Sequence, residues 1–554
     1  MVHYYRKSLV LGSCQKSNGK ELRKMSITTE KHRTWLTQAL PVILLLLGGA
    51  LRLLFLGEMP DGMHQDESTV AWNAFAILHE GMDSAGHYFP VYMADWGDGH
   101  SALYVWLLIP FLALNGGHVT PFFSRLPQAI VSIFTLWAVY CLVKRLFNRN
   151  AGLWSLFVLA ICPWHIMMSR WGLDANMAPG FLIFGLYFFI RGLDQKKYLL
   201  LSGFFYGMSL HAYAVIWPIV PIILIMQILY CLAHKKLRVD RWSLSASLIL
   251  FIIAFPLLLF VLVNADLIPE ITLPFITIPQ MGGYRGSEIA LSIPEMWYNF
   301  RTALSLLWHQ NTSAPYDILL PWGLFYDIGR FFIIFGVIAL LVRLAAGFRK
   351  REFVKEYFLF VQLVGGGITC LLVNAGMHRI NSLYIPLVLA QGYGIWTLIE
   401  LLQSRKKQLA QITSAGITAI YLFCLVMFQR DYYTDYRQLA AAYYGDGLQE
   451  CVDFALEQCA ERNLAAITVE KGAQWPRLLL FTETLPSDYL SSVVYDIPPA
   501  PASFETQGIH INTRINYDSI NYNSIYIIYF VDVPVFEDEF TLTQFHDWYV
   551  AVPK

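Results

Sequence analysis

The chain has 554 residues, of which 56% are hydrophobic, 15% aromatic and only 14% charged, and its 40 basic residues balance 40 acidic ones. Because soluble proteins usually carry about a quarter charged residues, this composition excludes an ordinary soluble enzyme. It predicts a mainly α-helical, polytopic membrane protein, and no nucleic-acid partner is expected.

Residues 1–36 are polar and basic, and the first apolar run, Leu40 to Leu56, is followed by no small-residue cleavage site, so no cleavable signal peptide is expected. Basic clusters recur between later apolar runs, at Lys144–Arg149, Arg191–Lys197, Lys235–Arg241, Arg343–Lys355 and Arg405–Lys407. The positive-inside rule places these clusters, together with residues 1–36, in the cytoplasm of a multi-pass protein of the cell membrane.

The opposite-facing links are then residues 57–100, 169–176, 265–328 and 374–381, and they hold most of the polar side chains between the apolar runs. Between the outer loop that ends near His100 and the inner loop at Lys144, the chain must cross the membrane an odd number of times. Two apolar runs, 103–114 and 122–142, lie in this interval. The first is shorter than the ~20 residues of a helical span, so a tilted, re-entrant or interfacial placement stays open. We expect 11 or 13 transmembrane helices within a membrane domain of residues 37–428.

Residues 429–554 differ in composition from the membrane domain. From residue 428 onward the chain has seven basic and 18 acidic residues, which fits an exterior location. Helical spacing over 441–462, short strands at 464–470, 524–533 and 548–552, and a loop at 498–508 predict a small extracytoplasmic α/β domain. Cys451 and Cys459 are eight residues apart on the predicted helix, roughly 12 Å, so we expect no disulfide there and no zinc cluster.

The first outer loop, residues 57–100, contains adjacent carboxylates, Asp66 and Glu67, soon after a predicted span. The following stretch has apolar residues at Val70, Phe75 and Ile77, compatible with a short amphipathic helix in the membrane interface. A solvated loop can simply carry acids. A carboxylate held at the lipid boundary is costly unless it works in a site, and we therefore favour a functional role for Asp66.

The other outer links contain further candidates. Arg170 and Asp174 are four residues apart, and a structural i,i+4 pair and a polar cavity lining explain them equally well. His378 and Arg379 stand before a span without acids nearby in the sequence, and the planar fork of an Arg suits a lipid phosphate.

Weaker candidates for the same cavity come from two further segments. His211 and Tyr213 lie near the outer end of a helical hairpin, where a His is more often a hydrogen-bonded core residue than a ligand. Arg285 belongs to a Gly-rich outer loop that could fold over a ligand.

In order along the chain, three stretches resemble the C-type (GT-C) membrane glycosyltransferases, in particular the branch of protein O-mannosyltransferases and aminoarabinose transferases. They are GEMPDGMHQDESTVAWNAFAILHEGMDSAGHYFP, SRLPQAIVSIFTLWAVYCLVKRLFNRNAGLWSLFVLAICPWHIMMSRWGLDAN and GMHRINSLYIPLVLAQGYGIW. Each motif alone is weak, but their order is fairly specific, and the likeness covers residues 35 to 430.

The resemblance implies transfer of a sugar from a polyprenyl-phosphate donor to a hydroxyl acceptor at the outer leaflet, usually with inversion. It implies that Asp66 is the general base, that Glu67 orients the acceptor or sugar, and that Arg379, with His378, neutralises the lipid phosphate. A protein, a lipid or a cell-surface glycan would serve as acceptor. No cofactor is required by the sequence, and because His and acid ligands are present, a divalent metal stays open.

The sequence also departs from that family. Where relatives often have a Lys-Pro-Pro-Leu-like stretch, this chain has GHSALYVW, in which His100 is the polar candidate, and the Thr-Lys-Gly of some relatives is replaced by HAY at 211–213. Competing hypotheses are a transporter or flippase, a polymer ligase for lipid-linked glycans, and a receptor-like scaffold. Transporters often show repeated halves, which this sequence lacks.

Overall fold

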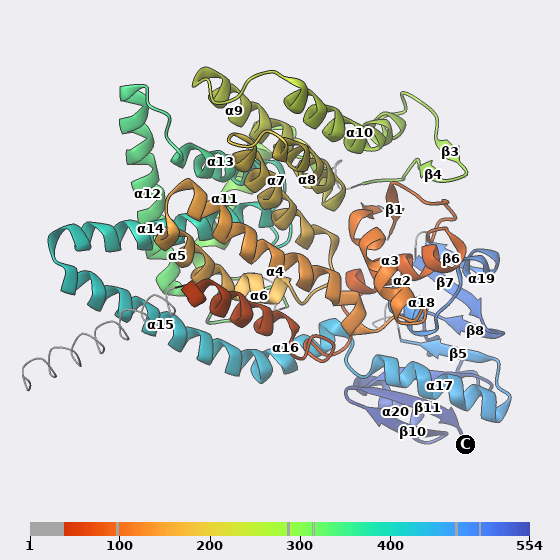
Figure 1. Ribbon diagram of the computed structural model, residues 1–554. Coiled ribbons are helices and arrows are strands. Elements are labelled where there is room, and N and C mark those ends of the chain that lie inside the picture. The colour runs from red at the N-terminus through yellow and green to blue at the C-terminus, as the bar shows by residue number, and fades with distance from the viewer. Residues whose placement is uncertain are drawn as a thin grey trace, which may run out of the picture.

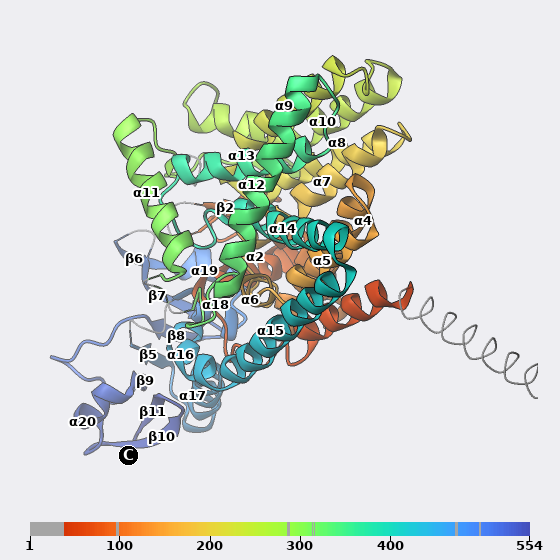
Figure 2. The ribbon, with the colours of Figure 1, turned by 90° about the vertical axis from the view of Figure 1, so that its left-hand side faces the viewer.

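The computed structural model describes residues 38–95, 99–284, 288–312, 314, 316–470, 475–497 and 500–554. Helices make up most of the chain, as predicted, and form one large helical body (Figure 1). The C-terminal strands lie together at one end of this body, next to the helices of the first outer loop, and the turned view in Figure 2 agrees.

Among the described residues, six helical segments are long and apolar enough to cross a membrane. They are α4 (Pro121–Leu146), Ala214–Ala233 with α9 (Ile219–Ala233), α10 (Arg241–Asn264), α12 (Asp327–Lys350), Asn381–Arg405 with α14 (Tyr384–Arg405), and α15 (Lys407–Tyr433). Shorter apolar helices are Gln38–Leu53, α3 (Leu103–Leu114) and α13 (Glu356–Leu372). The polytopic, mainly helical class is confirmed, whereas the total of 11 or 13 spans stays a prediction.

The remaining helices of the body are α5 (Arg149–Ala160), α6 (Pro163–Met168), α7 (Ala178–Gly192), α8 (Tyr198–Ala212) and α11 (Ile293–His309). Small residues allow the closest contacts between helices. A Cβ added to Gly336 on α12 would lie 1.9 Å from the Ala390 carbonyl oxygen on α14, and one added to Gly394 would lie 2.4 Å from the Phe332 carbonyl oxygen. The backbones of α12 and α14 therefore touch where they cross.

The first outer loop contains α2 (Gln65–Glu80) and an antiparallel hairpin of β1 (Tyr92–Ala94) and β2 (Gly99–Ser101). The helix was expected, whereas its predicted place in the membrane interface stays a prediction. Every residue from Glu67 to Ile77 is buried, because α3 packs on one side and α18 (Trp475–Phe481) of the C-terminal region packs on another. Protein, rather than lipid and water, covers α2.

The C-terminal region has a seven-stranded sheet in the order β10-β11-β9-β5-β8-β7-β6. The strands are β5 (Ala466–Val469), β6 (Val494–Ile497), β7 (Ala500–Thr506), β8 (Ile509–Asn512), β9 (Ile525–Tyr529), β10 (Phe540–Phe545) and β11 (Trp548–Pro553). β5 pairs in parallel with β8 and β9, and the outer pairs are antiparallel. The expected loop at 498–508 is wrong for 500–506, because β7 is held between β6 and β8 despite Pro501.

Helices α16 (Asp435–Tyr444), α17 (Leu448–Arg462) and α19 (Pro486–Ser492) complete this region, and the expected boundary at residue 429 falls inside α15. Several polar contacts fasten the region to the first outer loop. The Trp72 indole donates to the Thr484 carbonyl at 2.9 Å, and Glu80 accepts from the Ser487 N–H and hydroxyl. Arg437 pairs with Asp61 at 2.6 Å.

The contact between α12 and α14 gives a stability prediction. Gly336→Ala should lower the free energy of unfolding by about 1–3 kcal/mol, because the new methyl group overpacks the helix crossing. Gly416→Ala on α15 is the matched control, since a Cβ there meets nothing within 4 Å. Thermal unfolding of both variants in detergent should show a loss for Gly336→Ala alone, and equal midpoints would contradict the tight crossing.

Candidate functional site

A capping box fixes the backbone around the two adjacent carboxylates at the start of α2. His64 precedes the helix and accepts a hydrogen bond at Nδ1 from the Asp66 N–H at 3.3 Å, while Glu67 accepts from the His64 N–H at 3.4 Å. Burial, assisted by Arg477, lowers the pKa of His64 to about 3. The imidazole is therefore neutral, and its 3.8 Å approach to the Asp66 carboxylate is not an ion pair.

The Asp66 side chain is 32% exposed and opens into a small polar cleft. The cleft encloses about 370 Å³, part of it open to solvent, and is lined by Asp66, Val70, Asp95, His100, Leu173, Asp174, Tyr213 and His378. Asp66, His100, Asp174, Tyr213 and His378 were predicted site residues from five separate segments of the chain. The fold thus gathers half of the ten candidate residues around one cleft.

Hydrogen bonds between these segments hold the cleft walls in place. His100 lies on β2, with Nε2 3.1 Å from the Asn73 amide nitrogen of α2. Asp174 begins the short helix η1 (Asp174–Met177) and accepts from the Ser101 N–H at 3.0 Å and the Ala175 N–H at 2.6 Å. The β1–β2 hairpin is therefore tied both to α2 and to the link after α6.

Glu67 points away from the cleft into a buried ion pair. Its carboxylate accepts from Arg125 Nε at 2.9 Å and Nη2 at 3.1 Å, and from the Gly172 N–H at 3.1 Å. Arg125, on α4, also donates to the carbonyls of Leu56, Pro60 and Gly62. With the capping bond from His64, Glu67 accepts four hydrogen bonds, so its place is at the hub of four segments rather than beside a substrate.

Arg170 is fully buried and caps the first helix rather than facing Asp174. Its guanidinium donates to carbonyl oxygens at the end of that helix and just beyond it, those of Leu51, Leu54, Phe55 and Met59. These include carbonyls that a helix end leaves without an internal partner. Of the two residues, Asp174 lines the cleft and Arg170 orients the helix that leads to it.

His211 is not among the residues that line the cleft. His211 Nε2 lies 2.7 Å from the Ile253 carbonyl oxygen and joins α8 to α10. Of the two neighbouring candidates His211 and Tyr213, Tyr213 is the one that lines the cleft. Arg285 lies outside the described residues.

Arg379 lies beside His378 at the end of the chain segment that enters α14. Its Nη1 is 2.7 Å from a Glu288 carboxylate oxygen, and both side chains are about 30% exposed. No acid lies near Arg379 in the sequence, and Glu288 reaches it from a distant segment of the chain, residues 265–328. An ion pair this exposed is weakly held, so a stronger anion can replace Glu288.

Asp317 is a site residue that the sequence analysis missed. It lies in the outer loop before α12, only 5% exposed, and its Oδ1 accepts no hydrogen bond from the described residues. Burial and the nearby Asp66 carboxylate raise the pKa of Asp317 to about 7. Tyr316 beside it packs its ring 4.8 Å from that of His64. In the sequence, Asp317 is one acid in the long segment 265–328, and neither periodicity nor a motif distinguishes it from the other acids there.

Arg477, on α18, brings a buried positive charge from the C-terminal region to the start of α2. Its Nε donates to the Met63 carbonyl at 2.8 Å. Burial lowers its pKa to about 10, while Asp66 and Glu67 act in the opposite direction. The Arg477 guanidinium is thus still charged at neutral pH and places a positive charge near Asp66.

Within the described ranges, no group of three or more His, Cys, Asp or Glu side chains is placed to hold a metal ion. Asp66, Asp95, His100 and Asp174 share the cleft without forming such a group. The metal requirement therefore stays as open as the sequence left it.

Comparisons with known proteins relate this geometry to one superfamily. Residues 99–260 match the family model described as dolichyl-phosphate-mannose-protein mannosyltransferase. The structure is similar to that of ArnT from Cupriavidus metallidurans in the apo state, with a TM-score of 0.53 and 11% identity over 94% of this chain and 98% of that one. ArnT bound to undecaprenyl phosphate gives a TM-score of 0.50 and 11% identity over 92% and 97% of the two chains. No curated protein matches the chain.

An Archaeoglobus fulgidus oligosaccharyltransferase in complex with zinc and sulfate matches at a TM-score of 0.46 and 15% identity, over 70% of this chain and 53% of that one. The family model and the ArnT structures confirm the resemblance drawn from the sequence. The chain has the C-type membrane glycosyltransferase fold, and its match to the mannosyltransferase model includes β2, with His100, and η1, with Asp174.

The raised pKa of Asp317 gives a pH prediction. The folded protein holds this proton up to about pH 7, whereas the unfolded chain releases it near the ordinary value of 3.8, so Asp317 destabilises the fold increasingly as pH rises between those values. Asp317→Asn should remove that loss, at most about 1.4 kcal/mol per pH unit. The thermal midpoint of the variant in detergent should exceed that of the wild type by clearly more at pH 8 than at pH 5, and a difference that is the same at both pH values would refute the assignment.

Proposed function

We propose that this chain, with the C-type membrane glycosyltransferase fold, is a glycosyltransferase that moves a hexose or pentose from a polyprenyl-phosphate donor to a hydroxyl acceptor. Asp66 accepts the proton of the acceptor hydroxyl, the oxygen attacks the anomeric carbon, and the bond to the carrier phosphate breaks with inversion. The reaction takes place at the extracytoplasmic face, with residues 1–36 in the cytoplasm and the C-terminal region outside.

The observation that carries the proposal is the position of Asp66. It is the only carboxylate of the acidic pair that reaches the cleft, and the helix N-terminus and buried Arg477 both favour its ionised form. A hydroxyl is a weak nucleophile, and a positioned base contributes about 10²–10⁴-fold to its reaction. The capping box fixes the backbone that carries this base.

Glu67 supports the reaction through position. Its ion pair with Arg125 holds the first turn of α2 against α4 and the Gly172 backbone, so that Asp66 keeps one direction. The Asp66 carboxylate lies near Asp317, and its negative charge, together with burial, raises the pKa of Asp317. The two carboxyl groups therefore do not ionise together at low pH. Of these acids, Asp66 alone is both exposed and placed at the cleft.

The donor phosphate is assigned to Arg379, with His378 at the cleft wall. Ion-paired Arg379 is exposed enough to exchange Glu288 for a phosphate, and its planar fork donates two parallel bonds to such an anion. Positive charge at this point stabilises the negative charge that grows on the leaving phosphate. His378, adjacent in sequence, connects this point to the cleft that contains Asp66.

Asp66→Asn should abolish transfer, with a fall in kcat of at least about 10²-fold, because the amide cannot accept the proton. Glu58→Gln, an exposed acid of the same loop, is the matched control and should keep wild-type kcat. Both are assayed with labelled polyprenyl-phosphate sugars in proteoliposomes. Near-normal turnover by Asp66→Asn would remove Asp66 as the base, and lipid translocation without sugar transfer by the wild type would favour a flippase.

Variants of the Arg379–Glu288 pair test donor binding separately from the chemical step. Arg379→Ala should raise KM for the lipid-linked donor at least several-fold, whereas Glu288→Gln should lower it, because the arginine then needs no exchange of partners. A pair that served only to hold the loop would make both variants change KM in the same direction. Donor titrations at saturating acceptor, with both variants checked for monodispersity, distinguish the two outcomes.

A further inference from the structure

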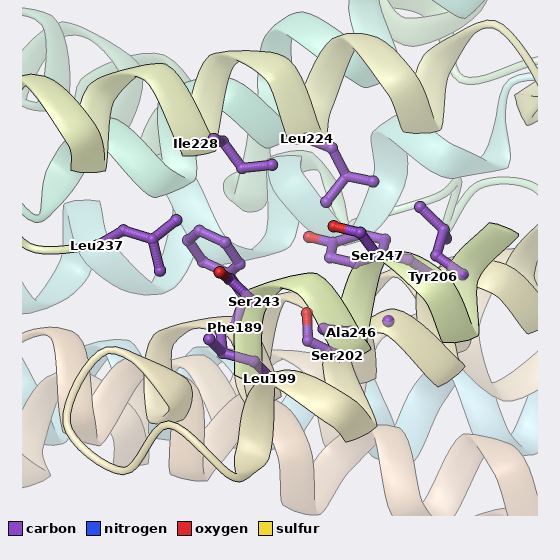
Figure 3. A pocket seen from close by; sticks show the side chains of 12 residues that line it. Phe189, Leu199, Ser202, Tyr206, Leu224, Ile228, Leu237, Ser243, Ala246 and Ser247 are labelled. Atoms are coloured by element: carbon purple, nitrogen blue, oxygen red, sulfur yellow. The ribbon is translucent and has the colours of Figure 1, made fainter. Parts of the chain in front are cut away.

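An apolar pocket lies between α7, α8, α9 and α10, away from the polar cleft (Figure 3). It encloses about 470 Å³, and its hydrocarbon walls come from Phe189, Leu199, Leu224, Ile228, Leu237 and Leu250. Figure 3 shows Leu224 and Ile228 pointing from one helix toward the side chains of the others. Such a pocket matches a hydrocarbon chain.

Two of the polar groups in the pocket wall are already used within the protein. The Ser202 hydroxyl donates to the Gly185 carbonyl at 3.0 Å, and the Tyr206 hydroxyl donates to the Gln227 side chain at 3.2 Å. They therefore offer little to a polar ligand. α10, which forms one wall, is only 17% buried over its apolar window, so the pocket adjoins the surface that faces lipid.

A second pocket, of about 500 Å³, continues from the first and is strongly basic. The two share Leu199 and Leu237 as lining residues. The second is lined in addition by four cationic side chains, against Asp240 as the acid: Lys196, Lys235, Lys236 and Arg238. Asp240 pairs with Lys196, which leaves an excess of positive charge at the mouth of the hydrocarbon pocket.

This double pocket lies at the end of the helices opposite the cleft. Leu199 is in the first turn of α8, and Tyr213 of the cleft directly follows its last turn, about 20 Å farther along the helix axis. The basic loops at this end are those that the positive-inside pattern assigns to the cytoplasm.

We propose that the double pocket binds one anionic glycerophospholipid of the cytoplasmic leaflet. The phosphate of the headgroup lies among Lys235, Lys236 and Arg238, and one acyl chain fills the apolar pocket beneath it. Basic pockets between transmembrane helices are suited to anionic headgroups, and a hydrocarbon chain supplies the apolar area that the walls require. A donor lipid is disfavoured, because a sugar held at this end would be separated from the cleft by the length of α8, about 20 Å between Leu199 and Tyr213.

The test uses the full-length protein in detergent, with dioleoyl phosphatidylglycerol and dioleoyl phosphatidylcholine as probes and bound lipid counted by native mass spectrometry. One phosphatidylglycerol should be retained with at least tenfold higher affinity than phosphatidylcholine. Ser247→Trp, which fills the apolar pocket, and the double change Lys235→Gln with Arg238→Gln should each weaken that binding at least tenfold.

Ser245→Trp is the matched control on α10, since Ser245 is exposed and outside the pocket lining, and Lys406→Gln with Lys407→Gln is the control for charge alone. Both controls should retain wild-type binding. Equal retention of the two lipids, unchanged binding by Ser247→Trp and by the Lys235/Arg238 variant, or preferential retention of a polyprenyl phosphate added as competitor would each overturn the proposal. Lys235 and Arg238 lie in the loop between α9 and α10, so the double change Lys235→Gln with Arg238→Gln leaves the helices intact. It therefore tests the proposal even if Ser247→Trp fails to fold.

Discussion

The buried ion pair between Glu67 and Arg125 is the constraint on which the arrangement around the polar cleft depends. Both side chains are fully enclosed, and charges in such a place are tolerated only when paired and fully hydrogen-bonded. Glu67 accepts four bonds and Arg125 donates five, and their partners come from the start of α2, α4, the loop at 56–62 and the Gly172 link. A buried pair of this kind contributes little net stability, but removing one partner leaves an uncompensated charge, so it fixes which arrangement of these segments forms.

The ion pair also explains why two adjacent acids differ in role. Successive residues of a helix point about 100° apart, so when Glu67 is held toward α4, Asp66 must face another direction, and in this fold it faces the cleft. One carboxylate has all its acceptor positions filled, and the other remains about one third exposed with cations at a distance. Environment, rather than residue type, separates the fully bonded buried acid from the partly exposed acid at the cleft.

The sequence predicted the class, the helix after Asp66, three of the C-terminal strands and most of the cleft residues, because composition, periodicity and motif order are local signals. It did not predict the Arg379–Glu288 pair, Asp317 or Arg477, since each depends on contacts between segments far apart in the chain. The role of Arg170 was undecidable for the same reason, because its partners are carbonyl oxygens that any sequence has. β7 was missed because prolines suggest a loop, whereas pairing on both sides overrides that preference.

The C-terminal region is part of the site's construction rather than an appendage to it. α2 carries Asp66, yet a helix buried on nearly all sides from Glu67 to Ile77 needs a cover that the membrane helices do not supply, and α18 supplies it. The same short helix brings Arg477 to the Met63 carbonyl, and Trp72 and Glu80 are bonded to the segment that follows. An acidic region that places its buried arginine against the first turn of α2 therefore does two things at once. It covers the apolar face of the helix, and it holds positive charge where Asp66 must stay ionised.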